Sequence, residues 1–393
     1  MLGQGKFPIS KRVTQQAPSP LTQIFELRDS YLRSDRKLDL IDASQGVPSY
    51  PPPKSIQRVL QKAALQSESY SYTDRQGIFE LRDAICKDFK VNSGFELSTN
   101  EVLITSGCNA AFCVAVTALL ENEDEVIVPR PYYFNHPMWI EMIGGKVVDV
   151  PLDVGGELNV SNIIDAITPK TRAVIVVSPG NPMGASAPKQ QLEMLAQKLG
   201  HRGIFLILDE TYRAFSESRE YPFSWASFSD FPNLVRLLSF SKELAIPGLR
   251  VGAVCANSEI IPEMLKVHDC FSICTPKIGQ LATIEGLLDQ SPWKKEKILA
   301  IAEKRETFRD ALHKAPRGFK VEACGGFFSW VKHPIDGMYS WDVSRKLVTE
   351  IGILTLPGSL FGPGQESYLR IGLAGLSLAE IEEFPKRIEC LEL

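Results

Sequence analysis

The residues best suited to chemistry in this chain lie within the segment 234–252. A short apolar run, typical of a buried strand, ends there at Ser239, Ser241 and Lys242, and Arg250 follows eight residues after the lysine. A lysine amine can form a Schiff base with a carbonyl group. An arginine guanidinium is a permanently charged, fork-shaped ligand for phosphate. The segment therefore suits a ligand that carries both a carbonyl and a phosphate, the alternative being a surface loop with one solvated lysine.

Polar side chains also follow four other short apolar runs of the sequence. In open α/β sheets ligands bind beyond the carboxyl ends of the strands, so these groups are expected to meet at one edge. Amides that open a helix bind phosphate, an aromatic ring can stack on a heteroaromatic ligand, and a carboxylate that ends an apolar run needs a partner. Taken one at a time, these groups could equally belong to an ordinary turn, to the aromatic core or to a helix N-cap. Their occurrence after several strands of one sheet favours a ligand-binding site. They are Gly107, Cys108 and Asn109 after the first run, Tyr133 after the second, Asn181 after the third, and Asp209 with Tyr212 after the fourth.

The elements that must position these groups follow the pattern of an α/β protein. Seven short β-branched runs alternate with helical stretches between about Glu101 and Ala256, which predicts a mainly parallel sheet covered on both faces. From about Gln280 the chain turns helical, with a long helix expected from near Pro292, and then gives a few strands and a final helix. We therefore expect residues 46–285 to form a large ligand-binding domain and residues 286–393 a smaller α+β domain, with residues 1–45 as an N-terminal arm and part of that smaller domain.

Composition narrows the class of protein. The chain has 393 residues, of which 44% are hydrophobic, and a formal charge of −4. Without a block of like charges or an apolar run of about 20 residues, nucleic acid and membrane are not expected as partners. The N-terminus has no apolar core of a secretory signal. Eight scattered cysteines lack the pairs of a zinc site, so we expect no metal, and reduced thiols in a cytoplasmic protein.

Three motifs of the chain together resemble those of the class I/II aminotransferases. They are N-P-x-G at 181–184, D-E-x-Y at 209–212 and S-x-S-K with a later arginine at 239–250. These aminotransferases are fold-type I enzymes that use pyridoxal 5′-phosphate (PLP), and the resemblance extends from about residue 46 to residue 374. It implies a three-layer α/β/α large domain, a smaller α+β domain, and transfer of an amino group between an amino acid and a 2-oxo acid.

The resemblance also implies a role for each candidate residue. Lys242 would hold PLP through a Schiff base and shuttle the substrate's α-proton, while Asp209 would keep the pyridine nitrogen protonated. The remaining implied contacts are Asn181 and Tyr212 to the ring phenolate oxygen, with Asn181 also at the substrate, and Ser239, Ser241, Arg250 and the amides of Gly107, Cys108 and Asn109 to the phosphate.

Two further positions match residues of the family outside the strand ends. Tyr72 stands five residues before Gly77, as does the family tyrosine that reaches the phosphate from the neighbouring subunit, which implies a homodimer with composite sites. Arg370 matches the arginine that binds the substrate carboxylate in a bidentate pair, with Gly46 in the opposite loop. A surface salt bridge is the other interpretation of Arg370.

The reaction type and the substrate stay open at this point. The segments N-P-M-G and E-L-A-I-P-G-L-R-V-G are also similar to 1-aminocyclopropane-1-carboxylate synthases and natural-product cyclases, which implies elimination, cyclisation or oxidation as the alternative. A PLP-binding regulator is disfavoured, because the first ~45 residues are too short for a DNA-binding module. Neither Arg75 nor Arg213 clearly marks a pocket for a second carboxylate, so aspartate is not favoured. Tyr132, Phe134 and Phe328 suit an aromatic or large neutral side chain.

Overall fold

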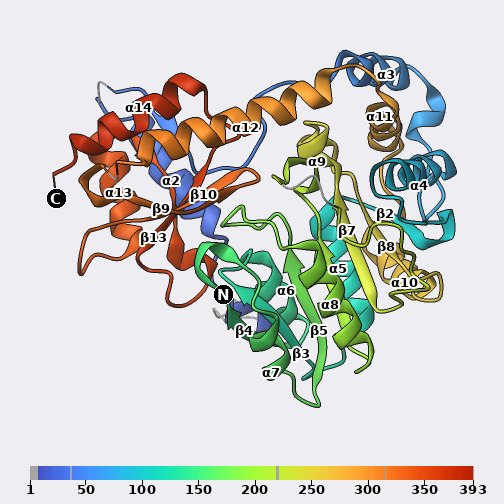
Figure 1. Ribbon diagram of the computed structural model, residues 1–393. Helices are drawn as coiled ribbons and strands as arrows, with labels where there is room; N and C mark the ends of the chain where they lie inside the picture. The colour runs from blue at the N-terminus through green and yellow to red at the C-terminus, as the bar shows by residue number, and fades with distance from the viewer. Residues whose placement is uncertain (1–7, 36–37, 218–220, 315, 393) are drawn as a thin grey trace, which may run out of the picture.

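The computed structural model describes residues 8–35, 38–217, 221–314 and 316–392, so parts of the expected N-terminal arm lie outside the described residues. Its centre is a seven-stranded sheet with the strand order β2-β8-β7-β6-β5-β3-β4 (Figure 1). Strand β8 is antiparallel to both neighbours and the other pairs are parallel. The strands are β2 (Val102–Thr105), β3 (Glu125–Arg130), β4 (Lys146–Pro151), β5 (Thr171–Val177), β6 (Phe205–Asp209), β7 (Leu234–Ser239) and β8 (Gly252–Ala256).

Each central strand buries both of its faces, which explains its continuous apolar sequence. In β6, Leu206 and Leu208 pack on one side of the sheet and Ile207 on the other. The first side is covered by α3 (Lys54–Ala64), α4 (Phe79–Ser93), α7 (Val160–Asp165), α8 (Lys189–Gly200) and α11 (Lys277–Leu288). The second side is covered by α5 (Cys108–Leu119), α6 (Asn135–Met142) and α10 (Ile261–Ser272). The three-layer, mainly parallel fold expected from the sequence is therefore confirmed.

A second, smaller sheet lies at the other end of a long helix. Helix α12 (Trp293–Leu312) runs from the α3–α11 side of the molecule to the smaller sheet (Figure 1). Its Phe308 and Leu312 join a separate core with α13 (Ser340–Ile351) and α14 (Leu378–Glu389). The smaller sheet has the antiparallel order β12-β13-β10-β9. Its strands are β9 (Lys320–Gly325), β10 (Phe328–Lys332), β12 (Leu356–Pro357) and β13 (Tyr368–Gly372).

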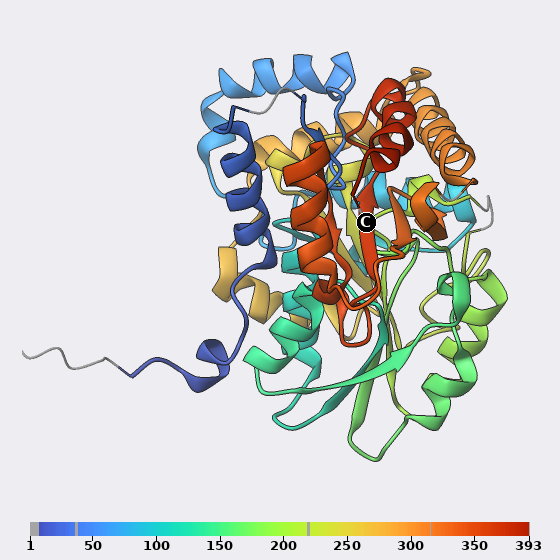
Figure 2. The ribbon, with the colours of Figure 1, turned by 90° about the vertical axis from the view of Figure 1, so that its left-hand side faces the viewer.

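Part of the N-terminal segment returns to this smaller core. Strand β1 (Ile41–Asp42) pairs in parallel with β11 (Ile353–Leu354), and α2 (Pro20–Leu32) lies beside α13. The short helix α1 (Lys11–Thr14) precedes them and lies at the edge of the molecule, beside α6 (Figure 2). The boundaries between the expected domains stay a prediction.

The two sheets meet where two glycine backbones touch. Gly184 has a φ of +79°, and a Cβ placed on it would overlap the carbonyl oxygen of Gly325 at the end of β9. Nearby, Arg305 of α12 donates to the carbonyl oxygens of Phe215 (3.0 Å) and Gly326 (3.2 Å). The glycine contact holds the loop after β5 against the smaller sheet, and Arg305 holds the segment after β6. Among the described residues, no helix has the length and apolar character needed to cross a membrane.

Candidate active site

A cavity of about 180 Å³ opens at the carboxyl edge of the large sheet. Strand β2 is antiparallel to β8, and β8 is antiparallel to β7, so β2, β7 and their parallel partners all end at this edge. The predicted groups after these strands therefore meet here. The predicted residues that line the cavity are Cys108, Asn109, Tyr133, Asn181, Asp209, Tyr212, Ser239, Ser241, Lys242 and Arg250.

Asp209 is a buried carboxylate with several donors. It ends β6 and is 5% exposed. Its Oδ2 lies 3.5 Å from Nε2 of His136, while its Oδ1 accepts from the backbone N–H of Thr211 at 2.9 Å and lies 3.7 Å from Sγ of Cys108. Burial alone would raise the pKa of Asp209, but His136 and Thr211 outweigh it, so the pKa lies below its ordinary value. The site therefore presents a fixed negative charge to a ligand.

Lys242 stands on a single helical turn that continues β7. This turn is α9 (Phe240–Glu243), and the lysine side chain reaches the cavity that Asp209 also lines. Burial, together with the positive charges of Arg370 and Arg250, lowers the pKa of Lys242 from 10.5 to about 8. A lysine in this state supplies a neutral, nucleophilic amine close to physiological pH.

Another group of residues at the cavity is arranged for an anion. Gly107, with φ +87°, is the N-cap of α5, so the first free amides of that helix face the site. A Cβ on Gly107 would lie 2.6 Å from Nη2 of Arg250, so only glycine lets the guanidinium approach this backbone. Arg250 donates to the carbonyl oxygen of Pro247 at 2.9 Å. Ser239 and Ser241 are buried beside it.

Arg370 is a buried guanidinium without a carboxylate partner among the described residues. It donates to Oδ1 of Asn181 at 3.0 Å and to the carbonyl oxygen of Ser44 at 2.5 Å. Its Cζ lies 4.6 Å from the ring centre of Phe328 and 5.3 Å from that of Phe361. Burial lowers the pKa of Arg370 to about 10. The surface salt bridge considered for this arginine is thus not what the structure contains.

Other predicted residues lie beside the cavity or away from it. Gly46 packs on Phe328, whose ring fills the space that a side chain at Gly46 would need. Tyr72 is 79% exposed and is absent from the cavity lining. Arg75 is exposed. Arg213, in contrast, is no solvated surface charge: its side chain is 11% exposed and forms two ion pairs.

Sequence reasoning missed the residues that support the site from behind. His136 is 2% exposed; its ring centre lies 4.2 Å from that of Phe112, with the rings tilted, and 5.3 Å from that of Tyr133, which is edge-on. Its position in the run P-R-P-Y-Y-F-N-H, which begins at the end of β3, was the available signal, because a histidine close after a strand end can reach a carboxylate at the end of another strand of the same sheet.

Together, fold and cavity define the class: a fold-type I, PLP-dependent enzyme. The residues fit that cofactor, because a nucleophilic amine, an ionised buried carboxylate and an anion-binding helix end line one cavity. The chain belongs to the family aminotransferase class I and II, whose sequence profile matches residues 39–388. Members of this family use PLP.

Named relatives cover nearly the full chain. An aspartate aminotransferase of Pyrococcus horikoshii is 30% identical over 391 residues, which are 98% of this chain and 97% of the relative. The aromatic-amino-acid aminotransferase 2 of Thermococcus litoralis is 27% identical and covers 97% of both chains. A Thermus thermophilus aspartate aminotransferase structure, a single mutant, matches with a TM-score of 0.88 at 26% identity, over 98% of this chain and all of that one.

Proposed function

We propose that this aminotransferase moves an amino group from an L-amino acid with a large neutral or aromatic side chain to a 2-oxo acid. The observation that carries the proposal is the surroundings of Arg370, whose guanidinium lies against the rings of Phe328 and Phe361. Arg213, which follows the site residue Tyr212 in the chain, is already paired with Asp88 and Glu243 and is not free to bind a second carboxylate. An apolar side chain suits such surroundings better than a second charge.

The residues of the cavity divide the work of such a transfer. PLP, when bound, supplies an electron sink for the electrons left by the departing α-proton. Lys242 would hold the cofactor and, once released, carry the α-proton, since its lowered pKa keeps the amine near the point of proton exchange. Asp209 would hold a proton on the ring nitrogen. Arg370 would bind the substrate carboxylate as a bidentate pair.

The remaining side chains of the cavity would orient the cofactor. Oδ1 of Asn181 accepts from Arg370, so the amide nitrogen of Asn181 is the group left to donate to the ring oxygen beside Tyr212. Burial raises the pKa of Tyr212, which keeps its hydroxyl protonated as a donor. Tyr133 would stack on the ring. The phosphate would bind the amides of Gly107, Cys108 and Asn109 with Ser239, Ser241 and Arg250.

The active unit in this proposal is a homodimer in the cytoplasm. Tyr72, exposed and outside the cavity of its own chain, would serve the site of the neighbouring subunit. The large and small domains would divide near residue 286. All eight cysteines are unpaired, which agrees with a reducing compartment. Sedimentation of the protein at micromolar concentration tests the dimer directly.

The experiment that tests the function is a panel of amino acids followed in the absorbance of the bound cofactor. Phenylalanine, tyrosine, tryptophan, leucine and aspartate are each mixed with the PLP-loaded protein, with and without 2-oxoglutarate or pyruvate. We expect amination of the cofactor with release of the oxo acid, fastest for the aromatic or large neutral donors, and none in Lys242→Ala. A faster reaction with aspartate would refute the preference. If product forms without any oxo acid, the reaction is elimination or cyclisation and not transamination.

A further inference from the structure

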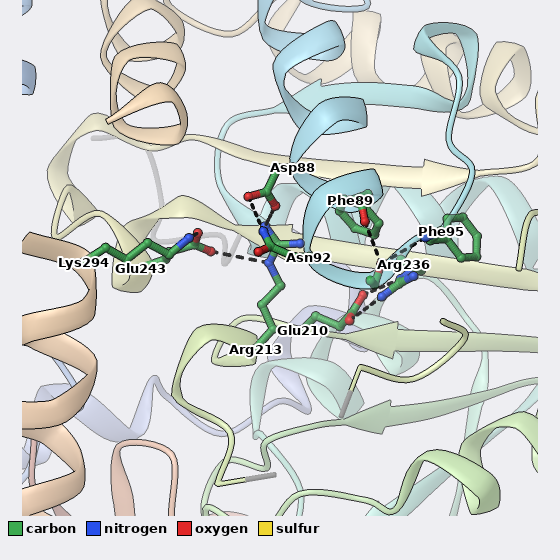
Figure 3. Close-up of polar contacts among 10 residues, drawn as sticks. Asp88, Phe89, Asn92, Phe95, Glu210, Arg213, Arg236, Glu243 and Lys294 are labelled. Atoms are coloured by element: carbon green, nitrogen blue, oxygen red, sulfur yellow. Dashed lines mark hydrogen bonds and ion pairs between the residues drawn. The ribbon is translucent and has the colours of Figure 1, made fainter. Parts of the chain in front are cut away.

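Three residues of the candidate site are each followed in the chain by a charged residue whose side chain is largely buried. Glu210 follows Asp209, Arg213 follows Tyr212, and Glu243 follows Lys242. Neighbouring side chains on a strand or turn point to different sides of the backbone. The three site residues line the cavity, whereas the charged residues that follow them do not. Figure 3 shows Glu210, Arg213 and Glu243 close to α4 and its Asp88.

Two of these charged residues bind each other. Nε of Arg213 lies 3.4 Å from Oε2 of Glu243, and Nη2 of Arg213 lies 2.7 Å from Oδ2 of Asp88 on α4. The other carboxylate oxygen of Glu243 accepts from Lys294, in the first turn of α12. The Glu243 side chain is only 2% exposed. Figure 3 shows the four side chains in a row between α4 and α12.

These ion pairs stabilise a backbone segment that would be unstable by itself. Helix α9 has only four residues, and one isolated helical turn is unstable in water because nucleation fixes several dihedrals for a single hydrogen bond. Residues Ala245 and Arg250, just beyond it, both have positive φ, a conformation that surrounding contacts must hold in place. The last residue of the turn, Glu243, is anchored on two separate elements, through Arg213 and Lys294.

We propose that Glu243 and Arg213 are positioning residues, which fix the spacing between the amine of Lys242 and the phenol of Tyr212. Lys294 connects this pair to α12, the helix that leads to the smaller sheet. The inference rests on the proposed function, because it assumes that Lys242 moves the α-proton.

The role of the pair is geometric and not electrostatic. Two carboxylates, of Asp88 and Glu243, balance two cations, of Arg213 and Lys294. Balanced charges exert little field on a neighbouring amine. A change of spacing, in contrast, acts strongly on proton transfer, because a misplacement of about 1 Å can cost about 10²-fold in rate.

The test uses the double variant E243Q/K294M, which removes one charge of each sign and leaves the Arg213–Asp88 pair intact. The PLP-loaded protein is assayed with the best amino acid of the panel, unlabelled and α-deuterated. We expect kcat to fall about tenfold or more, KM to change little, and the α-deuterium isotope effect on kcat to rise. Amide hydrogen exchange in segment 240–246 of the loaded protein should become faster.

The matched control is R172M/D124N, which removes another ion pair, with Arg172 Nε 3.1 Å from Asp124 Oδ2. That pair lies at the amino end of β5, away from the cavity. We expect its isotope effect and the exchange of segment 240–246 to equal those of the wild type.

Several results would overturn the inference. One is an unchanged kcat in E243Q/K294M. Another is a lower kcat in that variant with an unchanged isotope effect, and a third is an equal loss of kcat in the control R172M/D124N. If the double variant does not fold, E243D, which keeps the charge but shortens the side chain, takes its place under the same criteria. A wild type that aminates its cofactor with no amino acid of the panel would refute the proposed function, whereas an active wild type with unaffected variants refutes only the positioning role.

Discussion

The amine of Lys242 should titrate far below an ordinary lysine. Burial, then Arg370, then Arg250 lower its pKa from 10.5 to about 8. At pH 7 this shift raises the neutral, nucleophilic fraction of the amine about 300-fold, from about 0.03% to about 9%. The lysine would thus be ready to capture an aldehyde without a separate base.

Competitive acylation of the PLP-free protein measures this pKa. The protein is treated with a trace of acetic anhydride at pH values from 6 to 11, and the labelled peptides are quantified by mass spectrometry. Labelling of Lys242 should rise with pH and reach half its plateau near pH 8. Lys294 serves as an internal reference, because Glu243 outweighs burial and raises its pKa, so its labelling should rise only at the alkaline end.

Removal of one cation separates the causes of the shift. In Arg370→Met the pKa of Lys242 should move upward, yet stay below 10.5, since burial is the largest contribution. A wild-type midpoint near 10.5 would refute the reasoning about burial. A midpoint unchanged in Arg370→Met would refute the contribution of that guanidinium.

Two further substitutions, and a kinetic measurement on Arg370→Met, test the other parts of the site. Asp209→Asn should lower the rate of amino transfer about 10²- to 10³-fold and PLP affinity much less, as compared by kinetics and equilibrium titration; equal losses would contradict the assigned role. Gly107→Ala should weaken PLP binding about tenfold, or about 1.4 kcal/mol, because its Cβ would meet Arg250. Gly203→Ala, also at positive φ but with nothing within 4 Å, is its control and should bind PLP normally. Arg370→Met should lower kcat/KM, with a rise of about 2–5 kcal/mol in the corresponding activation free energy, and leave PLP binding unchanged; a loss in kcat alone would argue against carboxylate binding.

The large sheet could be predicted because its strands are buried on both faces. Such strands are nearly uniform in apolar and β-branched residues, as in Val102–Thr105 and Thr171–Val177, and the polar group after each is conspicuous. Strand β9 was not predicted. In its sequence K-V-E-A-C-G the two buried positions are the small residues Ala323 and Gly325, and the rest are exposed or half-buried, so its hydrophobic pattern is weak.

The contacts behind the cavity could not be predicted, because they depend on which distant segments meet. Arg213 and its partner Asp88 are 125 residues apart, and no local pattern distinguishes their pairing from two surface charges. The same holds for His136, whose partner Asp209 is carried by another strand. Sequence motifs identified the cavity-facing residues, whereas the residues that hold them required the fold.

The touching backbones of Gly184 and Gly325 bear on attempts to exchange parts of this enzyme with its relatives. Because neither position tolerates a β-carbon, a transplanted loop or a grafted small sheet must bring glycine to its side of the contact. A chimaera that respects every cavity residue but ignores this pair would push its two halves apart and displace Asn181, three residues away, from the guanidinium it orients. Libraries designed for new substrates should therefore keep glycine at both positions.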